Sequence, residues 1–302
     1  MRGAGLRRSW LGRSVIAGVN SIGQLGLAMY FQLNRRPMLV QGQQMDCRVG
    51  EKGSFRSTLE LVLDRYEPET TRLFHRLLQP GMTVVDIGAH GGYFSLIGAS
   101  RVGAAGKVYA FEPYPASFEE LQRNIDLNGY KNIQAVRKAV SDRTGVHKLL
   151  VNPKGSDRHS LYAGESSWER NSPEVETTRL DDFLEGCKWP RVDLIKMDIE
   201  GAEPAALAGM KQTLEKCGVR FLITELSPGP LKAAGFDPRG FLQELTNLGF
   251  SLYAVEGEKE PKALSPGGFA GFMQALQDRG GTNLLCESGP ALPQYAGAVR
   301  QN

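Results

Sequence analysis

Short apolar runs alternate with amphipathic stretches along most of the chain. The apolar runs have the length of buried strands and lie at 83–87, 107–111, 133–140, 147–151, 192–197, 221–224, 251–255 and 282–285. Helical spacing of the apolar positions occurs between them, at 93–102, 115–127, 205–216 and 240–248. This alternation predicts an α/β fold with a mostly parallel sheet and helices on both of its faces. The polar stretch 152–172 is expected to be a loop.

The first 45 residues differ from the rest of the chain in charge. They contain six arginines and no acidic residue before Asp46, so this arm carries 6 − 0 = +6 and the remainder carries 3 − 6 = −3. Apolar residues recur at helical spacing between Leu11 and Ile22. The arm is expected to be helical or partly disordered; it packs on the main domain, resembles a transit peptide, or lies on anionic lipid. We therefore predict a basic arm over 1–45 and one domain over 46–302.

Composition narrows the possible classes of protein. With 302 residues, of which 41% are hydrophobic, the chain can bury a large core. The 36 basic and 33 acidic residues leave a net charge of +3, which is too balanced for a nucleic-acid-binding surface. Four cysteines are scattered singly, so they indicate neither a zinc site nor a disulfide framework. The longest apolar stretch, 15–31, is shorter than the roughly 20 residues that cross a bilayer. We expect a cytoplasmic protein without a transmembrane helix.

Acidic residues close several of the predicted strands. Because ligands of open α/β sheets bind at the carboxyl ends of the strands, these acids are candidate site residues. The first strand turns into its helix through Asp86 and the glycine-rich segment 87–92, which offers free N–H groups and close backbone approach. Glu112 closes the next strand, 24 residues after Gly88, where a carboxylate can accept both hydroxyls of a ribose. The pattern predicts a nucleoside-containing cofactor.

The acid in front of the turn indicates which cofactor this is. A dinucleotide carries an anionic pyrophosphate at such a turn, and the carboxylate of Asp86 would repel it. S-adenosylmethionine (SAM) carries a sulfonium and an ammonium group and has no phosphate. The turn therefore favours SAM over a nicotinamide cofactor.

Six blocks follow one another in a specific order and spacing. They are 84–95 (VVDIGAHGGYFS), 111–113 (FEP), 124–129, 139–142 (AVSD), 178–183 and 195–203 (IKMDIEGAE). Together they resemble the FkbM family of SAM-dependent methyltransferases, over about residues 66–255. The resemblance implies a class I, Rossmann-like methyltransferase fold, with seven strands of which the last is antiparallel. It also implies O-methylation of hydroxyl groups on sugars, glycolipids or small natural products.

The resemblance also implies roles for single residues. Those that match the cofactor site are Asp86, Gly88, Ala89 and Gly92 on the methionine side, Glu112 at the ribose, and Asp142 where the adenine amino group is bound. His90 departs from the pattern, since the family often has asparagine there. It is either a turn residue or part of the acceptor site.

A hydroxyl acceptor needs a base or a metal ion to take up or replace its proton. Lys196 and Asp198 alternate onto one face of their strand, and Glu200 begins the turn after it. We expect Asp198 to touch the cofactor or orient a base, and Glu200 to be a polar active-site residue. Lys196 either pairs with Asp198 or assists the acceptor. Glu203 is equally consistent with a first-turn acid that the helix dipole favours.

The acids at the strand ends are also compatible with a metal site made of oxygen ligands. Glu225 closes the neighbouring strand and, with Asp198 and Glu200, has the ligand chemistry of a divalent cation site. Acids are common at strand ends without a metal, so the sequence favours a site without one.

Two segments are candidates for contact with the acceptor. The loop 152–172 contains Arg158, His159, Tyr162 and Trp168, a mixture that stacks on sugars, although a plain surface loop has the same composition. Tyr66-Glu67-Pro68 forms either a lip over the site or a helix entry.

Two other functions are compatible with these residues. The rival functions are a SAM-binding regulator or scaffold without catalysis and a nicotinamide-dependent oxidoreductase. The sequence leaves the acceptor and the oligomeric state open.

Overall fold

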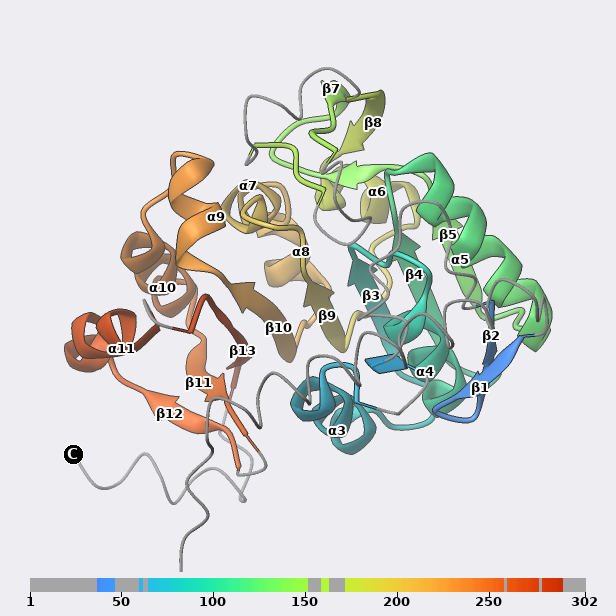
Figure 1. Cartoon of the computed structure of the whole chain (residues 1–302), viewed down its shortest axis with the longest axis horizontal. Coiled ribbons are helices and arrows are strands. Elements are labelled where there is room, and N and C mark those ends of the chain that lie inside the picture. The colour runs from blue at the N-terminus through green and yellow to red at the C-terminus, as the bar shows by residue number, and fades with distance from the viewer. Residues whose placement is uncertain are drawn as a thin grey trace, which may run out of the picture.

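The computed structural model describes residues 37–46, 60–61, 65–151, 159–162, 172–257, 260–276 and 279–289 (Figure 1). Its centre is a sheet of eight strands in the order β12-β11-β13-β10-β9-β3-β4-β5. These strands are β3 (Thr83–Ile87), β4 (Lys107–Phe111), β5 (Ile133–Val136), β9 (Leu194–Met197), β10 (Phe221–Leu226), β11 (Ser251–Val255), β12 (Lys262–Leu264) and β13 (Thr282–Glu287).

The topology confirms the predicted α/β class. Strands β5, β4, β3, β9 and β10 are parallel, and β13 runs antiparallel between β10 and β11. The chain starts the sheet at β3, adds β4 and β5 on one side, and then crosses to β9 on the other. Between β3 and β9 the connections lead away in opposite directions, which is the switch point where ligands of such sheets bind. Strand β12 makes eight strands, one more than the seven that the family resemblance implied.

Helices cover both faces of the sheet (Figure 1). One hydrophobic cluster joins one face to α3 (Pro68–Leu77), α4 (Tyr93–Val102) and α5 (Pro115–Asn128). A second cluster joins the other face to six helices. These are α6 (Leu180–Gly186), α7 (Glu203–Ala208), α8 (Lys211–Lys216), α9 (Pro228–Ala233), α10 (Pro238–Asn247) and α11 (Phe269–Leu276), the last after a 3-10 turn at Pro266–Gly268.

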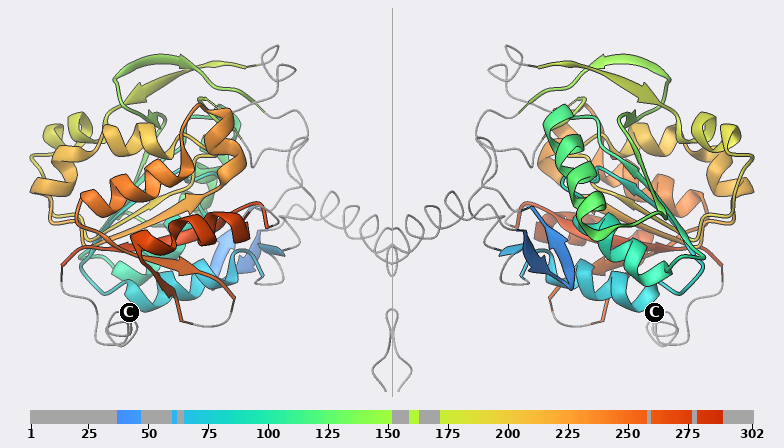
Figure 2. Two further views of the ribbon diagram at one scale, coloured as in Figure 1. Left: turned by 90° about the vertical axis from the view of Figure 1, so that its left-hand side faces the viewer. Right: turned by 90° about the vertical axis from the view of Figure 1, so that its right-hand side faces the viewer.

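A second, small sheet replaces part of two predicted strands. The predicted strand 133–140 ends at Val136, and the chain then enters β6 (Ala139–Val140). This strand pairs with β8 (Glu174–Thr178), which also pairs with β7 (Gly145–Lys148). Figure 2 shows β7 and β8 at the top of the molecule, beyond the central layers. Because β7 is mostly exposed, its short apolar signal could not show which sheet it joins.

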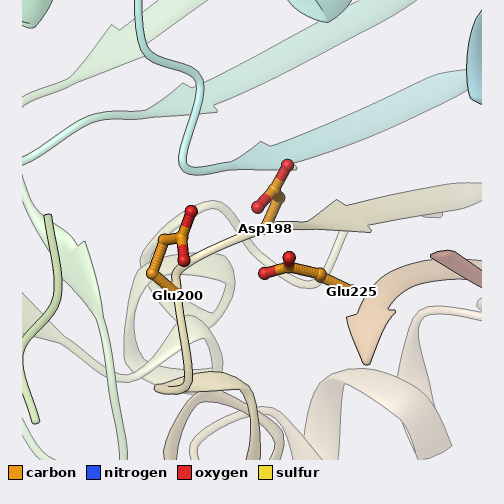
Figure 3. Close-up of side chains that lie close together, drawn as sticks. All are labelled: Asp198, Glu200 and Glu225. Atoms are coloured by element: carbon orange, nitrogen blue, oxygen red, sulfur yellow. The ribbon is translucent and has the colours of Figure 1, made fainter. Parts of the chain in front are cut away.

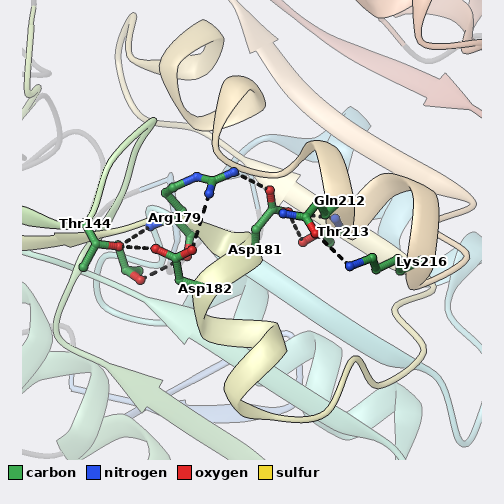
Figure 4. Close-up of polar contacts among 8 residues, drawn as sticks. Thr144, Arg179, Asp181, Asp182, Gln212, Thr213 and Lys216 are labelled. Atoms are coloured by element: carbon green, nitrogen blue, oxygen red, sulfur yellow. Dashed lines mark hydrogen bonds and ion pairs between the residues drawn. The ribbon is translucent and has the colours of Figure 1, made fainter.

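The predicted helix 205–216 is divided at Gly209. There the backbone passes so close to the small sheet that a Cβ on Gly209 would lie 1.9 Å from the carbonyl oxygen of Ser141. The second half, α8, is held by buried Asp181 of α6, which accepts hydrogen bonds from N and Oγ1 of Thr213 at 2.7 and 2.9 Å. Figure 4 shows this contact and the ion pair of Asp181 with Arg179.

The described end of the N-terminal arm is a hairpin rather than a helix. Strands β1 (Met38–Val40) and β2 (Gln43–Met45) pair with each other, and the chain then reaches α5 through a hydrogen bond from Asp46 N to Asn124 Oδ1 at 2.7 Å. Residues 1–36, where the helical spacing lies, are outside the described residues. Within the described part of the chain, no helix has the length and apolar character to cross a membrane.

Candidate active site

The turn after β3 is pressed between the ends of the neighbouring strands. Gly88 has a φ of 83°, and a Cβ on it would lie 2.1 Å from the carbonyl oxygen of Asp198 at the end of β9. On the other side, the N–H groups of Gly88 and Ala89 donate to the carbonyl oxygen of Phe111 in β4, at 3.0 and 2.9 Å. Only glycine fits the conformation and the space together. The turn is thereby fixed at the switch point of the sheet.

His90 occupies a left-handed position of this turn. Its φ is 48°, and Gly92 follows with a φ of 95° at the start of α4. Asparagine and glycine adopt such angles most readily, which explains why the family often has asparagine where this chain has His90. The geometry supports the turn interpretation of His90. Its N–H donates to Oε2 of Glu112 at 2.8 Å and so connects the turn to the next strand.

Glu112 has the placement expected of a ribose ligand. It is 6% exposed, and its Oε1 accepts a hydrogen bond from the N–H of Tyr114 at 2.8 Å, while Oε2 accepts that of His90. Burial raises the pKa of Glu112 to about 7, although both N–H groups oppose the shift. A carboxylate oxygen has two lone pairs, so each oxygen can accept one further hydrogen bond. The residue therefore fits a diol such as a ribose.

Asp86 contributes a buried acceptor beside the turn. It is 1% exposed; Oδ2 accepts a hydrogen bond from Ser95 Oγ at 2.6 Å, and Oδ1 has no hydrogen-bond partner among the described residues. Burial raises the pKa of Asp86, while nearby Lys196 opposes the rise. A buried carboxylate with an open lone pair is suited to a cationic ligand and is costly beside an anionic one. The residues present thus fit SAM.

A mostly apolar cavity continues from the turn toward the small sheet. Residues from six segments line it, including Gly88, Phe111, Pro113, Val140, His159 and Ile199. Its position next to Glu112 and its apolar walls suit the adenine ring.

Asp142 lies outside the lining of this cavity. It is exposed, and its Oδ1 accepts hydrogen bonds from Ser141 Oγ at 3.1 Å and from Tyr162 OH at 3.3 Å. Its predicted contact with the adenine amino group stays a prediction. Of the loop residues expected to meet a sugar, His159 lines the cavity and Tyr162 contacts Asp142, whereas Arg158 and Trp168 lie outside the described residues.

Lys196 forms an ion pair inside the sheet edge. Its Nζ lies 3.1 Å from Oδ2 of Asp198 and 4.5 Å from the ring centre of Phe94, and the residue is 3% exposed. Burial alone lowers the pKa of Lys196, but the carboxylates of Asp198, Glu67 and Asp86 outweigh it and raise the pKa above its ordinary value. Lys196 is therefore a fixed cation, and the pairing interpretation of this residue holds.

Three carboxylates meet at the end of β9 and β10. Asp198, Glu200 and Glu225 each offer an oxygen, and these atoms lie within 4.8 Å of one another (Figure 3). Glu200 is held in the turn by a left-handed φ of 53°. Glu225 accepts a hydrogen bond from Ser227 Oγ at 2.5 Å through Oε1. Burial, followed by the charges of Asp198 and Glu200, raises the pKa of Glu225 well above its ordinary value. The structure thus brings the predicted catalytic acids together.

Glu203 is more deeply buried than its position in a first helical turn implied. It is 1% exposed, and its Oε1 accepts a hydrogen bond from the N–H of Ile199 at 3.0 Å. Burial and the charge of Glu225 raise the pKa of Glu203 to about 8. Through this hydrogen bond Glu203 holds the start of the turn that contains Glu200.

Two residues at this edge belong to distant parts of the chain. Glu67 precedes α3 with a φ of 38°, and its Oε2 accepts a hydrogen bond from Nδ2 of Asn283 at 2.9 Å. Asn283 in turn lies opposite Glu225 in the antiparallel pair β10–β13. Glu67 was part of the predicted lip, but Asn283 had no signal in the sequence, because a single asparagine in a strand carries no motif.

The strand order and the acidic glycine turn at its switch point are those of a class I SAM-dependent methyltransferase. The family profile described as "Methyltransferase FkbM domain" matches residues 86–252, more than half of the chain. The chain belongs to the FkbM methyltransferase family, and it is a methyltransferase by both fold and family.

Similarity to characterised relatives is low in identity but extends over much of the domain. The 2-O-methyltransferase NoeI of Sinorhizobium fredii is 28% identical over 217 residues, which are 64% of this chain and 86% of that protein. The hexuronic acid methyltransferase AglP of Haloferax volcanii is 25% identical over 187 residues, 62% of this chain and 71% of that protein. "Methyltransferase 1" of Beauveria bassiana is 32% identical over 144 residues, which span 42% of this chain and only 57% of that relative.

Among solved structures, a SAM-dependent methyltransferase from Aquifex aeolicus aligns with a TM-score of 0.41 at 14% identity. The alignment covers 73% of this chain and 88% of that one. At this score the likeness adds nothing to what the strand order already shows.

Proposed function

We propose that this methyltransferase transfers the methyl group of SAM to a hydroxyl group of a sugar or a sugar-containing molecule. The observation that carries the proposal is the meeting of Asp198, Glu200 and Glu225 at the sheet edge, beside the turn that fits the cofactor. A site that only binds SAM has no need of three converging carboxylates there. Transfer to a hydroxyl, in contrast, needs a group that accepts its proton.

The chemistry assigned to SAM is an in-line displacement. A lone pair of the acceptor oxygen forms the new O–C bond, the C–S bond breaks, and its electron pair stays on sulfur as a neutral thioether. The hydroxyl proton goes to a carboxylate, and Glu200 takes this role because its turn begins at the end of β9 and its acid faces the other two. Lys196 neutralises Asp198, which keeps that carboxylate in place. Alignment of the two reacting atoms supplies much of the rate.

The acceptor class is supported by the surroundings of the carboxylates and by the relatives. A polar groove with an empty volume of about 660 Å³ lies at the same edge, and its lining includes Glu67, Thr70, Glu256, Arg279, Thr282 and Asn283. Such a lining offers many hydrogen bonds to a hydroxyl-rich molecule. NoeI is named as a 2-O-methyltransferase and AglP as a hexuronic acid methyltransferase. A glycolipid acceptor, with the basic arm on the membrane, stays a prediction.

The test measures methyl transfer in a single turnover from labelled SAM to a panel of free sugars, uronic acids and glycolipids. Glu200→Gln is expected to slow transfer by about 100-fold or more, the usual contribution of a general base, while SAM still binds. Glu185→Gln is the control, since Glu185 is exposed on α6, and it should react at the wild-type rate. If Glu200→Gln transfers the methyl group at the wild-type rate, Glu200 is not the general base. SAM binding without product on any acceptor would instead support a non-catalytic regulator.

A further inference from the structure

The cluster of Asp198, Glu200 and Glu225 gathers three acidic side chains at one edge of the sheet. Asp198 has an ion pair with Lys196, whose Nζ lies 3.1 Å from Oδ2. The same Lys196 also faces the carboxylates of Glu67 and Asp86, so one ammonium serves several acids. Three carboxylate oxygens within 4.8 Å of one another repel strongly at the edge of a protein interior. A cation bound between these oxygens would offset their repulsion.

Glu225 provides a second and independent observation. Its Oε1 accepts the hydroxyl of Ser227, but its Oε2 is buried and has no hydrogen-bond partner in the described part of the chain. A buried carboxylate oxygen without a partner costs free energy unless a ligand satisfies it. Figure 3 shows the carboxyl group of Glu225 directed toward those of Asp198 and Glu200. The open acceptor therefore belongs to the cluster.

The donor atoms indicate what kind of ligand fits. All three are carboxylate oxygens, and they come from the end of β9, the following turn and β10. Oxygen-only ligand sets suit hard cations such as Mg²⁺, Mn²⁺ and Ca²⁺, whereas zinc sites usually include histidine or cysteine. Mg²⁺ in particular is commonly held by a few carboxylates and completes its shell with water and substrate oxygens.

We propose that Asp198, Glu200 and Glu225 bind one divalent cation, Mg²⁺ or Mn²⁺, and that this ion also binds the hydroxyl group of the methyl acceptor. The second half rests on the proposed function. A cation bound to a hydroxyl oxygen favours loss of its proton, so it shares with Glu200 the task of activating the acceptor. The sequence favoured a site without metal, because it shows neither the convergence of the three acids nor the unsatisfied oxygen of Glu225.

Binding of Mn²⁺ to the full chain tests the first half without any need for activity. The protein is freed of metal with EDTA and titrated with Mn²⁺, and the free ion is followed by electron paramagnetic resonance. We expect one Mn²⁺ per chain in the absence of SAM and acceptor, displaced by excess Mg²⁺. If Mn²⁺ stays free, or if it binds without a defined stoichiometry, the proposal is wrong.

Two variants and a control locate the ion. Glu225→Gln and Asp198→Asn keep the size of the side chains, and each should weaken Mn²⁺ binding by more than about tenfold, as losses around metal sites do. Glu185→Gln is the control: Glu185 is an exposed acid on α6 and does not belong to the cluster, so Mn²⁺ should bind as to wild type. Thermal unfolding establishes that each variant is folded. Binding to both variants at wild-type affinity would overturn the assignment.

Calorimetry with SAM on the same samples separates this proposal from the proposed function. A chain that binds SAM and methylates its acceptor in EDTA at the rate seen with Mg²⁺ has no catalytic cation, yet it remains a methyltransferase. A chain that binds Mn²⁺ as expected but yields no methylated product keeps the ion site and loses the proposed reaction.

Discussion

The part of the site that we assign to the cofactor and the part that we assign to the acceptor are built in different ways. On the cofactor side, both oxygens of Glu112 accept backbone N–H groups, one from two residues away and one from the turn after β3. On the acceptor side, the three acids meet across β9 and β10, and Glu225 lies opposite Asn283 from the far end of the chain. The first half thus rests on backbone geometry, and the second on side chains that distant segments bring together.

This difference separates the SAM-binding features that a whole class of enzymes can share from the acceptor-binding features that are specific to this chain. Backbone contacts at a glycine turn can serve any member of a SAM-binding class, because they do not depend on the acceptor. Side chains that depend on strand register can change without loss of the cofactor site. We therefore expect substitutions in the cofactor half to affect folding or SAM binding, and substitutions in the acceptor half to affect transfer alone.

The largest effect is expected where the two halves touch. Gly88→Ala places a Cβ 2.1 Å from the carbonyl oxygen of Asp198, at a φ of 83°, so β3 and β9 must move apart. We expect a loss of about 4 kcal/mol or more in the free energy of unfolding, since overpacking and a left-handed alanine add. Urea denaturation measures it. Gly129→Ala, at a φ of 67° with nothing within 4 Å, is the control and should cost about 1 kcal/mol. If Gly88→Ala and Gly129→Ala lower the free energy of unfolding equally, Gly88 is not in tight contact with the carbonyl oxygen of Asp198.

The next largest effect is expected on SAM binding when Glu112, the proposed ligand of the ribose, is replaced. Glu112→Ala removes two acceptor oxygens for the ribose, and hydrogen bonds to charged groups contribute about 1.5–3 kcal/mol each. We expect SAM to bind about 100-fold more weakly or not at all, as calorimetry will measure. Glu185→Ala, an exposed acid on α6, should leave the affinity unchanged. Unchanged affinity in the Glu112 variant would remove this residue from the cofactor site.

A smaller effect concerns the pH dependence of stability. The pKa of Glu203 is raised to about 8 in the folded chain by burial and by Glu225, against an ordinary value of 4.5. Glu203 therefore stays protonated to a higher pH in the folded state than in the unfolded state. The free energy of unfolding falls as the pH rises from about 4.5 to about 8. Each pH unit in this window corresponds to about 1.4 kcal/mol, so Glu203 should lower the free energy of unfolding by roughly 2–3 kcal/mol from pH 5 to pH 7.

Glu203→Gln should remove that part of the decline, because the amide oxygen can still accept the N–H of Ile199. Urea denaturation in EDTA at several pH values compares the two proteins. Burial also raises the pKa of Glu112, to about 7, so Glu112→Gln should flatten the curve as well. If the decline is as steep in Glu203→Gln as in wild type, Glu203 is not buried as a proton-holding acid.

The smallest effect is expected on SAM affinity when Asp142, at the outer end of the proposed cofactor site, is replaced. Asp142 is exposed, and its predicted hydrogen bond to the adenine amino group lies in water. We expect Asp142→Ala to weaken SAM binding by only about fivefold, near the 1 kcal/mol of an exposed hydrogen bond. Calorimetry with SAM measures this, and Asp182→Ala, an exposed acid of α6, provides the comparison. A loss as large as that of Glu112→Ala would place Asp142 inside the pocket.

Local features account for the part of the fold that was predicted. Strands β3, β4, β9, β10, β11 and β13 appear where short apolar runs predicted them, because a buried parallel strand needs a continuous apolar segment. The predicted strand 133–140 was wrong in its second half, and the helix 205–216 is interrupted at Gly209. In both places the contact that decides the outcome is with the small sheet, whose pairing joins β6 to β8 across more than 30 residues.

The sequence by itself determined the α/β fold, the glycine turn after Asp86 and the place of Glu112 at the end of the next strand, because each depends on residues that are neighbours along the chain or follow at a fixed spacing. It also placed Asp198 and Glu200 at the end of one strand. The sequence left open whether Glu225 meets them and whether Glu67 lies at the site; only the tertiary structure decided both, and it added Asn283 and the burial of Glu203. Those relations follow from strand register and helix packing, which bring together residues up to 216 positions apart.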